Sequence, residues 1–65
     1  MEKTIREQLQ EGFSFYTRHA DWEQQRADQA TAGSEIQREL REAAAFNRGR
    51  ADAYKEIMEQ IFGIM

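Results

Sequence analysis

Cysteine and proline are both absent from the 65-residue chain. Without cysteine there can be no disulfide, no thiolate zinc site and no iron–sulfur cluster, and a single histidine, His19, is too little for a His-rich metal site. A chain of this length rarely buries enough apolar area to fold alone, so disulfides, metals or a second subunit usually contribute. Self-association is the contribution that this composition leaves open, and we expect no cofactor.

The sequence also lacks a long apolar run and a strong excess of one charge. No segment approaches the roughly 20 apolar residues of a membrane span, and the charged start MEKTIREQLQ has no apolar signal-peptide core. We therefore expect a cytoplasmic protein that does not contact membranes. The 12 acidic and 9 basic residues are interspersed and give a net charge of −3. Non-specific nucleic-acid binding usually needs a clustered basic face instead.

The residues that are present favour helix, because alanine, glutamate, glutamine, arginine and leucine are good helix formers. The one clear interruption is ATAGSEIQ, where Gly33 suits the left-handed position after a helix and Ser34 forms a capping-box pattern with Gln37. The sequence predicts one domain over residues 1–65, with a helix over about 2–30, a turn at 31–33 and a helix over about 34–62. A single continuous helix, tolerating Gly33 at about 1 kcal/mol, is the alternative.

So short a connection makes the two helices antiparallel neighbours. The apolar positions of the second helix cover about half of its circumference, which is more than one neighbour can bury. We therefore expect an all-α fold, a two-helix antiparallel hairpin that dimerises into a four-helix bundle with coiled-coil packing. The expected core stripes are Ile5, Leu9, Phe13, Tyr16, Ala20 and Ala27 on the first helix, and Ile36, Leu40, Ala43, Ala51, Tyr54, Met58 and Ile61 on the second.

The segment GFSFYTRHADW, residues 12–22, holds more aromatic side chains than one helix face can bury. Phe13 and Tyr16 belong to the core stripe, whereas Phe15 and Trp22 lie on a second face roughly 120° away. Aromatic residues beside arginines are typical of the hot spots of protein interfaces. On the second helix, apolar residues outside the stripe widen this surplus surface. The expected protein-interface residues are Phe15, Arg18, His19, Trp22, Arg26, Phe46 and Ile57.

Asn47 falls in the middle of the expected core stripe of the second helix, where a helix seam usually carries an apolar residue. Two interpretations stay open. Asn47 is buried and fixes the register or the oligomeric state, or the helix is rotated slightly and Asn47 is half-exposed. Ala44 is expected at one edge of the apolar arc, beside the stripe.

The sequence shows little that supports catalysis. His19 and Glu23 are four residues apart and could share a metal, but two ligands do not make a site. Ser14 and Ser34 have no general base beside them, there is no glycine-rich phosphate loop, and a helical hairpin lacks a concave pocket. We predict a non-enzymatic protein-binding module, an adaptor, regulator or inhibitor, that acts as a homodimer and binds another protein.

The charged residues give two alternative functions. Arg41, Arg48 and Lys55 recur every seven residues and form a basic stripe that a dimer could present to nucleic acid. Acidic residues four positions further on, such as Asp52 after Arg48, indicate a solvated face instead. The other alternative is an acidic inhibitor that imitates nucleic acid, for which a net charge of −3 is small.

Overall fold

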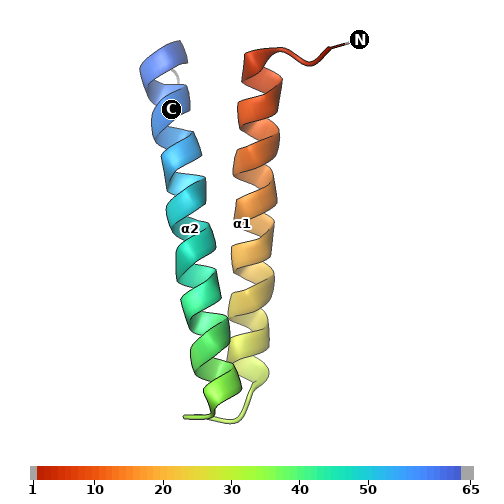
Figure 1. Ribbon diagram of the computed structural model, residues 1–65, viewed down its shortest axis with the longest axis vertical. Helices are drawn as coiled ribbons and strands as arrows, with labels where there is room; N and C mark the ends of the chain where they lie inside the picture. The colour runs from red at the N-terminus through yellow and green to blue at the C-terminus, as the bar shows by residue number, and fades with distance from the viewer. Residues whose placement is uncertain (1, 64–65) are drawn as a thin grey trace.

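The computed structural model describes residues 2–63, which form two α-helices, α1 (Ile5–Gln29) and α2 (Glu35–Phe62). The helices run antiparallel and side by side, with their connection at one end of the hairpin and the start of α1 and the end of α2 at the other (Figure 1). The predicted all-α antiparallel hairpin is thus confirmed, and the alternative of one continuous helix is wrong.

Helix α1 begins at Ile5, three residues later than the sequence pattern suggested, because Thr4 caps it. The Glu7 backbone N–H donates to the Thr4 hydroxyl at 3.1 Å, and the Thr4 backbone N–H donates to the Glu7 carboxylate at 3.3 Å. Each group satisfies a donor that the first helical turn would otherwise leave unpaired. The capping box of the chain is therefore the stretch TIRE, residues 4–7.

The turn between the helices is closed by the side chain of Gln37. Gly33 has the left-handed conformation, with φ of 77°, and its backbone N–H donates to Gln37 Oε1 at 2.8 Å. Gln37 Nε2 in turn donates to the carbonyl of Ala27 at 3.1 Å. The predicted capping box at Ser34 is therefore only half formed: Ser34 Oγ accepts from the Gln37 N–H, but the Gln37 side chain is buried between the helices.

The helices meet along a seam of mostly small side chains. We call seam residues the buried positions Ala20, Ala27, Gln37, Ala44, Ala51 and Met58. On each helix these positions recur every seven residues, which is the repeat of a coiled coil. The four alanines are at most 5% exposed, and Met58 is the only large apolar side chain among the described residues that is buried to this degree, at 2% exposed.

Three isoleucines predicted in the core stripes are exposed instead. Ile5, Ile36 and Ile61 are 66%, 65% and 58% exposed, whereas Ala44, expected beside the stripe, is buried. The apolar arc of α2 covers half of the helix, so hydrophobicity alone does not decide which edge meets α1. Small residues allow the two backbones to approach most closely, and the seam accordingly follows Ala44 and Ala51.

Asn47 is half-buried beside the seam, as the second interpretation of the sequence predicted. Its Nδ2 donates to Glu23 Oε1 on α1 at 2.6 Å, so its polar atoms have a partner across the hairpin. Because this bond forms only at one alignment of the helices, it also favours the observed register.

Toward the open end of the hairpin, the ring of Tyr54 fills the space beside Gly12, which has no side chain of its own. A Cβ atom on Gly12 would lie 2.5 Å from the ring of Tyr54, which is closer than atoms can approach. The same ring stacks on Tyr16 of α1, with centroids 5.7 Å apart and planes inclined by 24°. Glycine at position 12 therefore makes room for the tyrosine pair.

The hairpin is flat. Its backbone extends over 43 × 25 × 13 Å, so it is one layer of helices thick. Globular domains usually enclose a core between two packed layers. A single layer instead has two broad sides, and what each carries decides what the hairpin can bind.

Candidate protein-docking face

One broad side of the hairpin carries large apolar side chains. Among residues 2–63, seven large apolar residues are exposed, between 42% and 66%: Ile5, Phe15, Trp22, Ile36, Phe46, Ile57 and Ile61. Counted round each helix from the seam at about 100° per residue, all seven lie on the same side of the hairpin. We call this side the apolar face and define it by Phe15, Trp22, Ile36, Phe46 and Ile57.

A chain of ring contacts joins the two helices across this face. Phe15 meets Tyr16 edge to face, with centroids 5.1 Å apart. The Arg50 guanidinium of α2 lies 5.0 Å from the centroid of Tyr16 and 5.4 Å from that of Phe46. Phe15 and Phe46, 31 positions apart in the sequence, are thereby linked through Tyr16 and Arg50. The ring of His19 lies 4.4 Å from that of Phe15 and extends the same cluster.

Toward the turn, the face continues through Trp22. The Arg26 guanidinium lies 5.4 Å from the centroid of the Trp22 ring, which is the geometry of a cation–π pair. Arg26 also lines a shallow depression together with Ile36, on the other helix. A second shallow depression lies against Arg18, His19 and Trp22. Five of the predicted interface residues on α1 are therefore neighbours on one exposed surface.

The sequence pattern missed three contributors to this face. Ile36 was assigned to the core, and Tyr16 and Arg50 were not expected to connect the helices. Arg50 lies four residues after Phe46 and seven before Ile57, so all three follow one another on the same side of α2. That spacing could have predicted Arg50 as part of the face, but a charged residue is not expected within an apolar surface.

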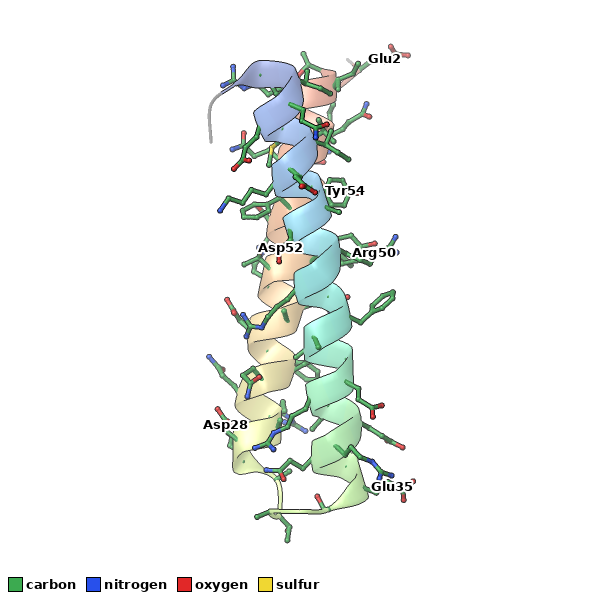
Figure 2. All side chains as sticks on the ribbon, turned by 90° about the vertical axis from the view of Figure 1, so that its left-hand side faces the viewer. Glu2, Asp28, Glu35, Arg50, Asp52 and Tyr54 are labelled. Carbon is green, nitrogen blue, oxygen red and sulfur yellow. The ribbon has the colours of Figure 1, made fainter. Side chains whose placement is uncertain are left out.

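The opposite broad side carries charged side chains. In Figure 2, Asp28 and Asp52 project from the side of the hairpin opposite to Arg50 and Tyr54, and Glu35 lies near the turn on the same side as Arg50. Arg48 of α2 reaches across this charged face to Asp21 of α1, with an Nη2–Oδ1 distance of 3.7 Å. Lys55 lines a depression there beside Asp52. The charged face therefore mixes both signs along its length.

The basic stripe proposed as a nucleic-acid contact lies along the charged face and is exposed throughout. Arg48 pairs with Asp21 of the other helix, not with Asp52 one turn away as its spacing suggested. Arg41 shares its shallow depression with Glu42. The stripe is thus interrupted by carboxylates from both helices.

The side chains that could bind a metal are dispersed. Within residues 2–63, no three carboxylate or imidazole groups come close enough to hold one ion. His19 contacts Phe15, and its candidate co-ligand Glu23 accepts the hydrogen bond from Asn47. Neither α1 nor α2 is long and apolar enough to cross a membrane.

No protein-family model, curated protein or solved structure matches this chain. Its function must therefore be inferred from the two broad sides of the hairpin and from what each could contact.

Proposed function

We propose that the protein is a non-enzymatic protein-binding module that acts as a helical-hairpin homodimer and serves as an adaptor, regulator or inhibitor. The observation that supports this most is the apolar face. Contiguous apolar surface is rare on soluble monomers, and where it is found it usually marks an interaction site. Here Phe15, Trp22 and Phe46 are each more than half exposed on one side of the hairpin.

The proposed mechanism is docking of a helical surface that is already formed. Phe15, Trp22 and Phe46 are the anchors, and their rings would enter the partner or be covered by it. Arg26 already stacks on Trp22, and Arg50 is already held between two rings. Side chains that are ordered before binding lose less conformational entropy on docking, which favours affinity.

Arginine and histidine surround these anchors and suit the rim of an interface. Arg18 and His19 are exposed beside Trp22, where they can donate hydrogen bonds to a partner while remaining partly hydrated. Interfaces typically combine an apolar centre with a polar rim of this kind, and arginine is enriched in them. The composition of the face fits a protein partner better than a small substrate.

Nucleic-acid binding through Arg41, Arg48 and Lys55 is the alternative, and the carboxylates of Asp21 and Asp52 beside the stripe disfavour it. The two functions differ in salt dependence. Phosphate-driven binding weakens steeply as salt rises, whereas aromatic docking changes little. A gel-shift titration with nucleic acid at rising salt tests the alternative directly.

The first test of the proposal is Trp22→Ala. Trp22 contributes nothing to the seam, so we expect nearly unchanged helicity by circular dichroism. Anchors of this type cost about 2 kcal/mol or more when truncated, so we expect association, with itself or with another protein, to weaken about 30-fold.

The matched control for Trp22→Ala replaces the charges of the other face, Arg41→Gln, Arg48→Gln and Lys55→Gln in one variant. Self-association is measured by light scattering, and binding of other proteins by affinity capture, for the wild type, the control and a Phe15→Ser/Trp22→Ser variant. If the face variants retain both kinds of association to the same extent as the control, the proposal is wrong. If Trp22→Ala unfolds although the wild type is folded at the mass of a single chain, Trp22 contributes to the core of the hairpin and has been placed on the wrong face.

A further inference from the structure

Resting on the proposed function, we infer that the protein that covers the apolar face is a second copy of the same chain. The two hairpins would stack with their apolar faces together and their charged faces outward, as a four-helix bundle. Four observations carry this assignment: the small seam, the dimensions of the face, its central aromatic cluster and the distribution of charge.

The seam of one hairpin buries few large apolar side chains. Its buried apolar side chains are four alanines and Met58. Chains of this size without disulfide or metal usually need a further apolar interface. That interface must be present whenever the chain is folded, and only a second copy is always available together with the first.

The dimensions of the face fit another hairpin. The broad side measures 43 × 25 Å, an area on the order of 1,000 Å², and each partner in a standard protein interface contributes roughly 800 Å². Apolar residues lie on both helices, from Ile36 near the turn to Ile57 toward the open end. A single docked helix would cover one strip of this surface, whereas a second hairpin is equally long and equally wide.

The centre of the face is also suited to a two-fold pair. Phe15 and Phe46 lie in the middle of their helices and are joined through Tyr16 and Arg50. In a two-fold interface the same surface serves both partners, so the middle of one copy meets the middle of the other. The aromatic cluster would thus pack on its own copy.

The two arginines of the apolar face already have aromatic partners within their own chain. Arg26 and Arg50 of the apolar face are each stacked on rings of their own chain. Glu39 lies three residues after Ile36 and seven before Phe46, so a carboxylate shares this side of α2. Asp21, Asp28 and Asp52 remain on the opposite side, where they stay in water.

The deciding measurement is the mass of the purified protein by light scattering during size exclusion. We expect the wild type at twice the 7.7 kDa of one chain. The Arg41→Gln/Arg48→Gln/Lys55→Gln control should keep that mass. For Phe15→Ser/Phe46→Ser we expect the dissociation constant of the dimer to rise roughly 100-fold or more, since each lost anchor costs about tenfold or more.

The double variant could fail to fold once it cannot dimerise, so the wild type provides a second measurement. If folding and dimerisation are coupled, the melting temperature rises with protein concentration by mass action. We expect such a rise over a hundredfold range of concentration, for the wild type and for the control. Trp22, the only tryptophan of the chain, reports the same event, because its emission moves to longer wavelength when dilution exposes it.

Two outcomes would overturn the inference. One is a wild type that is folded at the mass of a single chain, with a melting temperature independent of concentration. The other is a Phe15→Ser/Phe46→Ser variant that remains a dimer. In either case the face could still bind a different protein, and the proposed function would stand or fall by the capture experiment with the Trp22 variants.

Discussion

The seam and the apolar face differ in a way that reverses the usual arrangement of a globular protein. Inside the hairpin, the side chains that are fully covered are mainly alanines. On the outside of the same helices, Phe15, Trp22 and Phe46 are more than half exposed. In most domains the largest apolar side chains are the ones that are buried.

This difference indicates what each region is for. Alanine at every seventh position lets two helix backbones come close, but each alanine removes little apolar surface from water. The seam therefore fixes how α1 and α2 lie against each other, while large apolar side chains on the outside of the hairpin remain uncovered. A large side chain that remains exposed beside such a seam is available to whatever covers the hairpin.

The largest effect that separates the two regions is expected at neighbouring positions 57 and 58. Within residues 2–63, Met58 is the one large apolar side chain that is buried, at 2% exposed, so Met58→Ala should lower the free energy of unfolding by about 2–5 kcal/mol. Ile57 is 42% exposed on the apolar face, and Ile57→Ala should cost less than half as much. Urea unfolding of both variants at one protein concentration measures the difference. Equal losses would mean that Ile57 is buried as fully as Met58, either in the single hairpin or against a second copy.

The sequence predicted the two helices and the turn better than it predicted which side of each helix faces the other. The lack of proline and the position of Gly33 predicted both helices and the turn, and spacing correctly separated Phe13 and Tyr16 from Phe15 and Trp22. On α1 helical periodicity placed these four residues correctly, but it also put Ile5 in the core stripe, and Ile5 is 66% exposed.

On α2 the same reasoning placed Ile36 in the core and Ala44 beside it, and both assignments were wrong. An apolar arc of half the circumference can meet its neighbour along several lines, and closest approach of the backbones, not hydrophobicity, selects one of them. Gln37 could not be predicted as a buried residue for a related reason. Its burial depends on two backbone partners, Gly33 and Ala27, that only the folded turn brings together.

A smaller effect is expected from two glycines in the middle of the helices, of which one is covered by an aromatic ring and the other is open to solvent. Gly49 has nothing within 4 Å of where a Cβ would be, so Gly49→Ala should stabilise the protein by about 1 kcal/mol through helix propensity. Gly12→Ala should lose this gain, because the new methyl group would displace the Tyr54 ring and disturb its stacking on Tyr16, a contact worth about 0.5–1.5 kcal/mol. Thermal unfolding of both variants measures the difference.

The control for the glycine comparison is the same substitution in a Tyr54→Ala background. Without the ring, Gly12→Ala should recover the gain seen at position 49. If Gly12→Ala stabilises the otherwise unchanged protein as much as Gly49→Ala does, Tyr54 does not occupy the space over Gly12.

The smallest effects compare two polar contacts between the helices, one beside the seam and one on the charged face. Asn47 is half-buried and donates to Glu23 at 2.6 Å, so Asn47→Ala should cost about 1 kcal/mol and leave a carboxylate without its partner. Arg48 and Asp21 are 3.7 Å apart and more than half exposed, so Arg48→Gln should change stability by less than about 0.5 kcal/mol. Raising the salt concentration to about 1 M should distinguish the two contacts further, because salt screens an exposed ion pair and acts much less on a partly buried contact. A loss for Asn47→Ala that disappeared at high salt would show that Asn47 and Glu23 meet in water and contribute nothing to the register of the hairpin.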